Sequence, residues 1–133
     1  VNGPVKLYTC PPNPGGHTIS EGVMGHRAWG HNPDVYQEVD GITLDEFCRD
    51  KKVDFLKVDI EGAENTIFEG GATNMLATQR PSILLEVHRY VELERLYKLF
   101  ADLGYIVYDI DGIGKPTTFQ ADNHYLLVHE SRI

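Results

Sequence analysis

The sequence predicts an α/β fold in which two parallel strands joined by helices follow a β-hairpin and lead into an antiparallel pair of strands. Two nearly continuous apolar runs, Val53–Asp59 and Pro81–His88, are typical of strands that are buried in a parallel sheet. The segment between them is long enough for the helix that a right-handed parallel crossover requires. Beyond Leu103, two more strand-like runs are separated by a loop without the residues for a crossover helix, which indicates antiparallel pairing.

Residues 1–42 are predicted to form the hairpin and a long loop. Val5–Thr9 alternates apolar and polar residues, and a turn rich in proline and glycine follows, so we expect the return strand near His17–Ser20. From there to Val39 the sequence shows no period, and we expect a loop with one further strand at Val35–Val39. Several loop residues suit either a lid over an acceptor site or a polar surface: His17, His26, Arg27, Trp29 and His31.

Residues 43–133 are predicted to form the α/β core, which opens with a clear helix start. Thr43 is placed as the N-cap, and Glu46 completes a capping box, so the first helix should run to about Lys51. The other elements follow from the same patterns: a helix over Ala63–Phe68 that Gly70 and Gly71 interrupt before Ala72–Gln79 resumes it, an amphipathic helix over Tyr90–Leu103 closed by Gly104, and antiparallel strands over Tyr105–Ile110 and His124–His129.

Composition limits the kinds of partner. A chain of 133 residues suits one domain. Its net charge of −8, from 12 basic and 20 acidic residues, argues against nonspecific binding to nucleic acid or anionic lipid. We therefore expect a small partner, no nucleic acid and no membrane. Cys10 and Cys48 are too few and too far apart for a disulfide framework or a zinc motif, which indicates reduced thiols in a cytoplasmic protein.

A series of short motifs occurs in order along the chain: Thr43-Leu-Asp-Glu, the run Asp54–Glu64, Gly70-Gly-Ala, Pro81 through Glu86 and His88, and Gly104-Tyr-Ile-Val-Tyr. This series resembles the signatures of the FkbM methyltransferase family over roughly Val5 to Val128. The resemblance implies a class I, Rossmann-like fold and methyl transfer from S-adenosylmethionine to a hydroxyl oxygen of a small molecule such as a polyketide or a sugar.

The chain departs from the family in its donor site. Members carry a first strand with a glycine-rich turn and a second strand with an acidic end, and neither pattern is found here. We therefore expect a partial fold, the C-terminal part of a single domain, which by itself binds S-adenosylmethionine weakly and is inactive. Without the first strand, the edge of Val53–Asp59 would be unpaired, and we expect self-association through that edge or poor solubility.

Asp59 is the first catalytic candidate. The resemblance places it at the end of the strand that faces the donor's methyl group, where a carboxylate can contact the cofactor, accept the hydroxyl proton or orient the acceptor. The alternative is a helix cap. Glu61 is either catalytic or an acid in the first turn of the next helix, and we favour the latter. Glu64 should be solvated, and Lys57 should form a buried structural ion pair.

Glu86 and His88 lie two residues apart on one strand and therefore share a face. Because their strand should neighbour Val53–Asp59, these two residues are expected to converge with Asp59 and Glu61. His88 suits a general base, and the four residues together also suit a divalent metal, although we assign none. The simpler alternative is that Glu86 binds Arg89 or a backbone amide while His88 caps the strand end.

These observations favour an S-adenosylmethionine-dependent O-methyltransferase with Asp59, Glu61, Glu86 and His88 at its site. Two functions of other classes remain open from the sequence. One is a noncatalytic binding module that has kept the sheet but lost the donor half. The other is a metal-dependent hydrolase built on the same four residues.

Overall fold

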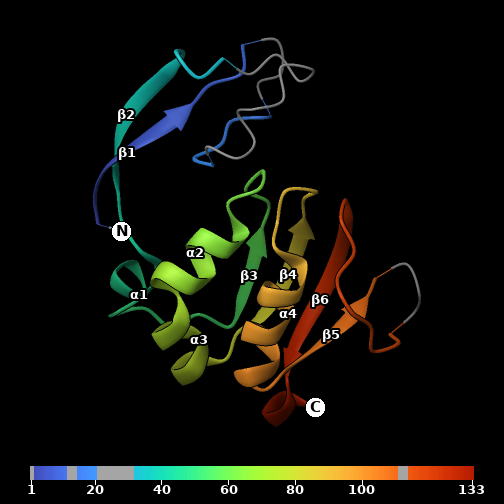
Figure 1. The fold of residues 1–133 in the computed structure, drawn as a ribbon. Coiled ribbons are helices and arrows are strands. Elements are labelled where there is room, and N and C mark those ends of the chain that lie inside the picture. Colours follow the sequence, from blue (N-terminus) through green and yellow to red (C-terminus); the bar gives the residue numbers. More distant parts are fainter. Residues whose placement is uncertain (1, 12–14, 21–31, 111–113) are drawn as a thin grey trace.

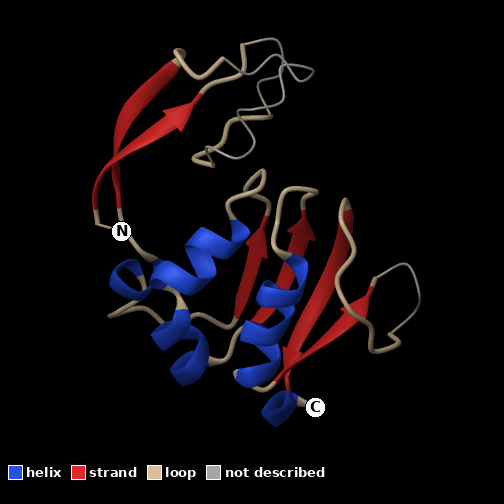
Figure 2. Ribbon diagram, in the orientation of Figure 1, coloured by secondary structure: helices blue, strands red, loops and turns tan. Residues whose placement is uncertain are grey.

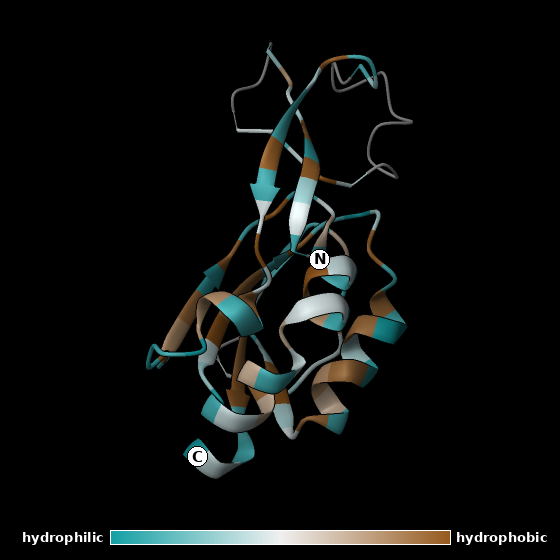
Figure 3. Ribbon diagram, turned by 90° about the vertical axis from the view of Figure 1, so that its left-hand side faces the viewer, coloured by the Kyte–Doolittle hydropathy of each residue, from teal (hydrophilic) through white to brown (hydrophobic). Residues whose placement is uncertain are grey.

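The computed structural model describes residues 2–11, 15–20, 32–110 and 114–133. These residues form a two-stranded sheet near the N-terminus and a larger α/β core (Figure 1). Seen from the side, the two-stranded sheet extends away from the core (Figure 3). The predicted mixed α/β architecture with a preceding hairpin is confirmed. No helix in the described part of the chain is long and apolar enough to cross a membrane.

The core sheet consists of β3 (Phe55–Val58), β4 (Ser82–Val87), β5 (Tyr105–Asp109) and β6 (Asn123–His129). Its strand order is β3-β4-β6-β5. Strand β3 runs parallel to β4, whereas β6 pairs antiparallel with both β4 and β5. The predicted parallel pair and antiparallel closing pair are therefore both present. Strand β6 lies between its neighbours although it follows both of them in the chain.

Three helices cover one face of this sheet (Figure 2): α2 (Glu64–Gly71), α3 (Thr73–Gln79) and α4 (Leu93–Asp102). The core forms because alternate residues of β4, Ile83, Leu85 and Val87, are fully buried. Phe68 of α2 and Phe100 of α4 pack edge to face with ring centroids 4.9 Å apart. Helix α4 is shorter than the predicted Tyr90–Leu103.

The hairpin pairs β1 (Gly3–Tyr8) with β2 (Tyr36–Gly41) in antiparallel register. The predicted return strand at His17–Ser20 is wrong, because this segment contributes only a bridge between Thr18 and Tyr8. Tyr8 also pairs with Tyr36, so the two segments contact β1 at the same residue. The alternation of β1 indicates a strand, but it does not indicate which of two later segments is its partner. The further strand expected at Val35–Val39 corresponds to β2.

The first core helix, α1 (Leu44–Phe47), begins as predicted and ends early. The hydroxyl of Thr43 accepts a hydrogen bond from the Glu46 N–H at 3.2 Å, which confirms the N-cap. The second half of the capping box is absent, because the Thr43 N–H donates to Asn2 Oδ1 at 2.8 Å and Glu46 pairs with Arg49. The helix ends at Phe47 rather than near Lys51.

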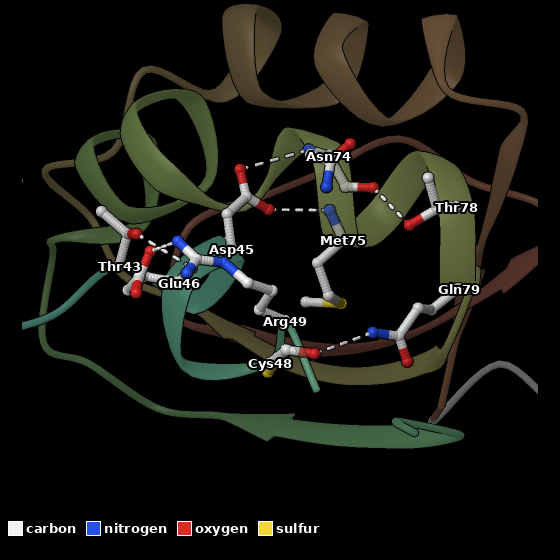
Figure 4. A pocket seen from close by; sticks show the side chains of 9 residues that line it. All are labelled: Thr43, Asp45, Glu46, Cys48, Arg49, Asn74, Met75, Thr78 and Gln79. Carbon is white, nitrogen blue, oxygen red and sulfur yellow. Dashed lines mark hydrogen bonds and ion pairs between the residues drawn. The ribbon is translucent and has the colours of Figure 1, made fainter. Parts of the chain in front are cut away.

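Helices α2 and α3 are separated at Ala72, not at the two glycines. Helix α3 has no cap from its own segment; Asp45 of α1 supplies one, accepting the N–H groups of Met75 at 2.7 Å and Asn74 at 3.3 Å (Figure 4). Around these bonds lies a pocket of about 300 Å³. The Asp45 carboxylate and the Gln79 amide in its lining join α1 to α3, so we assign the pocket a structural role (Figure 4).

Strand β3 lies at the edge of the core sheet, and within the described residues no strand pairs with its outer side. We expect the protein to self-associate through this edge as concentration rises. Phe55, whose exposed fraction is 55%, should contribute to the contact, so Phe55→Lys should shift the equilibrium towards the monomer. Light scattering over a concentration series measures this, with Ile133→Lys as the control at an exposed residue outside β3. A wild-type monomer throughout the series would contradict the expectation.

Candidate functional site

The candidate site lies where β3 and β4 end side by side (Figure 1). Asp59 directly follows β3, and His88 directly follows β4. Because parallel strands present their carboxyl ends at the same edge of a sheet, the two side chains lie close together. Glu61 reaches the same place from the turn after β3, and Glu86 reaches it from the end of β4. The four residues that the sequence predicts to converge are therefore together.

His88 is the centre of this group. Its Nε2 atom lies 3.8 Å from Asp59 Oδ1, 3.6 Å from Glu61 Oε2 and 3.6 Å from Glu86 Oε1. We call these four residues the carboxylate–imidazole cluster. All three distances are longer than a hydrogen bond, so one ring nitrogen faces three carboxylates without bonding directly to any of them. The ring is mostly buried, with 14% of its surface exposed, whereas Asp59 is 40% exposed.

Glu64 holds the imidazole from the other side. Its Oε1 atom lies 2.7 Å from His88 Nδ1 and also accepts the His88 backbone N–H at 3.3 Å. Glu64 is fully buried, so the expectation of a solvated side chain is wrong. An ionised carboxylate can only accept, which means that Nδ1 carries a proton and Nε2 points towards the cluster. Glu64 therefore fixes both the orientation and the tautomer of the ring.

The hydrogen bond to Glu64 raises the pKa of His88 above 6.5, and the charges of Glu64, Glu61 and Glu86 raise it further against the opposing effect of burial. In metal-free protein we expect NMR titration of the His88 ring to give a pKa above 6.5. Glu64→Gln should lower this value, because the amide keeps the acceptor and loses the charge. An unchanged His88 pKa in that variant would contradict the assignment.

The raised pKa also has a defined effect on stability. A group whose pKa is higher in the folded state stabilises the fold fully below its unfolded pKa, and this contribution is lost as pH rises through the folded pKa. The His88 contribution in metal-free protein is therefore present below pH 6.5 and declines above it. Comparing urea unfolding of the wild type and His88→Gln across this range isolates the contribution of His88.

The second oxygens of two cluster carboxylates have partners of their own. Asp59 Oδ2 lies 3.6 Å from Lys57 Nζ, and Lys57 is 65% exposed, so this ion pair is on the surface rather than buried as predicted. Glu86 Oε2 lies 3.1 Å from Nε2 of His124, its cross-strand neighbour on β6. The alternative pairing of Glu86 with Arg89 is wrong, because Arg89 binds Asp122.

The turn between β3 and α2 places Glu61 in an unusual backbone conformation. Glu61 has φ of 51° and Gly62 has φ of 91°, and the former is costly for a residue with a side chain. The buried hydroxyl of Thr18 donates to the Glu61 carbonyl at 2.8 Å and holds this turn from the N-terminal segment. Helix α2 begins only at Glu64, and its N-cap, Ala63, makes no side-chain bond, so neither Asp59 as a cap nor Glu61 as a first-turn acid is supported.

An apolar pocket of about 520 Å³ opens beside Asp59, between the hairpin, β3 and α2. Asp59 and Lys57 are its charged residues, and the rest of its lining is mostly aliphatic. It offers a wall for an apolar ring system next to the cluster, but no glycine-rich strand-to-helix turn. Of the loop residues considered for a lid, His26, Arg27, Trp29 and His31 lie outside the described residues, and His17 Nδ1 accepts the Cys10 N–H at 3.1 Å.

Reasoning from the sequence missed three residues that support the cluster: Glu64, His124 and Thr18. Glu64 could have been found from its spacing, because it lies four residues before Phe68 and therefore on the buried side of α2. His124 could not, since its position opposite Glu86 depends on the register of β6. Thr18 reaches the site only through the fold of the N-terminal segment.

Comparison with known proteins gives one significant family. Neither a curated protein nor a solved structure matches the chain significantly. The family model of the methyltransferase FkbM domain matches residues 7–107, which is more than half of the chain. The matched region includes β3, α2 and β4, and with them every residue of the carboxylate–imidazole cluster. The chain therefore belongs to the FkbM methyltransferase family.

Proposed function

We propose that the chain forms the acceptor-facing, catalytic part of an S-adenosylmethionine-dependent O-methyltransferase, whose substrate is a hydroxyl group on a small molecule or a sugar. One observation supports this proposal most strongly. The region matched by the methyltransferase family contains three carboxylates that converge on one imidazole at the carboxyl ends of adjacent parallel strands. This is the position where α/β proteins bind their substrates.

The cluster suits a hydroxyl acceptor. S-adenosylmethionine, when bound, supplies an electrophilic methyl group on a positively charged sulfur. As the acceptor oxygen bonds to that carbon, the carbon–sulfur bond breaks, its electron pair stays on sulfur, and the hydroxyl proton must leave. Asp59 is exposed enough to reach the acceptor, and its carboxylate takes this proton. The other cluster groups position the hydroxyl for in-line attack.

The residues of this chain can bind only part of S-adenosylmethionine. The apolar pocket beside Asp59 can hold a ring system, and Asp59 is the polar group that lies at both the pocket and the cluster. The chain has no glycine-rich turn for the methionine part, so we propose that the donor site is completed by residues outside this chain.

The test is methyl transfer from labelled S-adenosylmethionine by the full-length gene product that contains this sequence, against a panel of sugars and small hydroxylated compounds. We expect label in a base-stable ether and release of the demethylated donor. Binding of the donor without transfer to any compound would favour a noncatalytic binding module. The 133-residue chain is measured in parallel by equilibrium dialysis, where we expect weak or no donor binding.

A further inference from the structure

We infer that Asp59, Glu61 and His88 form a binding site for a divalent transition-metal cation, with Glu64 as the outer carboxylate that orients the histidine. One ligand atom from each of the three residues lies within 4.8 Å of the others. Binding of the ion does not depend on the proposed function. The role of the ion in catalysis rests on that function.

The pattern of hydrogen-bond donors and acceptors around His88 favours a cation. Because Nδ1 of His88 donates to Glu64, Nε2 of a neutral ring is an acceptor, and it faces acceptor oxygens of Asp59 and Glu61 at 3.8 and 3.6 Å. These distances are too long for a proton on Nε2 to form a normal hydrogen bond with either oxygen. A cation between the three atoms satisfies all of them at once.

The distances from the His88 nitrogen to the two carboxylate oxygens also fit a metal ion. Metal–nitrogen and metal–oxygen bonds in such sites are about 2.1 Å long, so two ligands of one ion lie between about 3.0 Å apart at a right angle and about 4.2 Å apart when opposite. The separations from Nε2 to the Asp59 and Glu61 oxygens, 3.8 and 3.6 Å, fall within this interval. Both carboxylates are partly exposed, which leaves open positions for water or substrate.

Glu64 supports the site independently of the acidic ligands. It is fully buried, it aims Oε1 at His88 Nδ1 from 2.7 Å, and its Oε2 has no hydrogen-bond partner among the described residues. Burying a carboxylate in this way is costly unless positive charge lies nearby. A carboxylate behind a histidine is the usual outer support of a metal-bound imidazole, since it fixes the ring and makes it a better ligand.

The ligand set indicates which ion the site prefers. Imidazole nitrogen suits zinc, iron and related metals, whereas carboxylates suit magnesium, calcium and manganese. One imidazole with two carboxylates therefore favours an ion that accepts both kinds of ligand, such as Mn²⁺. In the proposed reaction, an ion with open positions binds the acceptor hydroxyl and lowers its pKa, which eases loss of the proton.

The test is calorimetric titration of Mn²⁺ into the EDTA-treated and dialysed chain. We expect one ion per chain and affinity losses of at least tenfold in Asp59→Asn, Glu61→Gln and His88→Asn. Glu64→Gln should weaken binding by roughly 10- to 100-fold, as outer-carboxylate changes do. Asp102→Asn is the control, because this exposed carboxylate pairs with Lys98 on α4 and lies outside the cluster, so its substitution should leave binding unchanged. Equal affinity in the wild type and His88→Asn would overturn the site.

A measurement on the wild type removes any dependence on how the variants fold. Mn²⁺ is paramagnetic and should broaden the ring signal of His88 at substoichiometric concentration while the signal of buried His129 on β6 stays sharp. Uniform broadening of both signals would overturn the site. Because neither experiment uses a methyl donor or an acceptor, failure of the metal site is separate from failure of the proposed function. Methyl transfer that proceeds fully in EDTA would overturn the catalytic role of the ion.

Discussion

Replacing Gly71 with alanine is expected to lower the free energy of unfolding by about 2 to 4 kcal/mol. A Cβ atom on Gly71 would lie 2.5 Å from Cγ2 and 2.6 Å from Cβ of Thr43, distances that real contacts do not reach. Thr43 is β-branched and is held by two hydrogen bonds, one from its backbone N–H to Asn2 and one to its hydroxyl from Glu46 N–H, so it cannot move aside without loss of the α1 cap. Urea unfolding followed by circular dichroism measures the effect.

Gly70→Ala is the matched control for this prediction. Gly70 precedes Gly71 in the same helix, and a Cβ atom there would meet nothing within 4 Å. Alanine should therefore stabilise the protein by about 0.5 to 1 kcal/mol through its higher helix propensity. If both substitutions change stability in the same direction, the close approach of α2 to Thr43 is not what requires glycine at position 71.

Asp59→Asn is expected to reduce methyl transfer by the full-length protein by about 10²- to 10⁴-fold, the usual contribution of a general acid or base. The amide keeps the shape of the side chain but cannot take a proton from the acceptor at neutral pH. Product formation under saturating donor measures the loss. Folding should be little affected, because Asp59 is 40% exposed, its ion pair with Lys57 is on the surface, and its oxygen lies 3.8 Å from His88, beyond a hydrogen bond.

Asp54→Asn is the matched control for Asp59→Asn. Asp54 flanks the opposite end of β3, is 57% exposed and pairs with Lys52 and Arg132. Asp54 carries the same carboxylate group but lies away from the cluster. Because an exposed ion pair contributes little energy, its substitution should leave the rate of methyl transfer within about twofold of the wild-type rate. Near wild-type activity in Asp59→Asn would show that Asp59 is not the proton acceptor.

The strands that position the site could be predicted because their signal is local. The apolar runs that include β3 and β4 end in charged residues, and the parallel pairing then brings Asp59, Glu61, Glu86 and His88 together. Two consecutive strands joined by a helix are expected to be neighbours in a parallel sheet, whatever the distant segments do. This is why the sequence predicts the convergence of these four side chains although it misplaces several element boundaries.

The features that the sequence did not reveal depend on contacts between distant segments. The pairing of β1 with β2 rather than with His17–Ser20 joins two segments that are far apart in the sequence. The role of Gly71 was interpreted as a helix break, whereas the structure places it against Thr43 inside α2. Likewise, the spacing of Glu64 from Phe68 indicates the buried side of α2, but the partner that Glu64 binds, His88, follows a different strand.

The place of β6 between β4 and β5 has a consequence for synthesis on the ribosome. Strand β5 has no other partner in the core sheet, so it cannot join the sheet until β6 has been made. Until His129 leaves the exit tunnel, the edge of β4 that pairs with β6 is unpaired, which exposes the nascent chain to misassembly. Ribosome stalling before this point should therefore yield a protease-sensitive chain, and release of β6 should complete the sheet in one step.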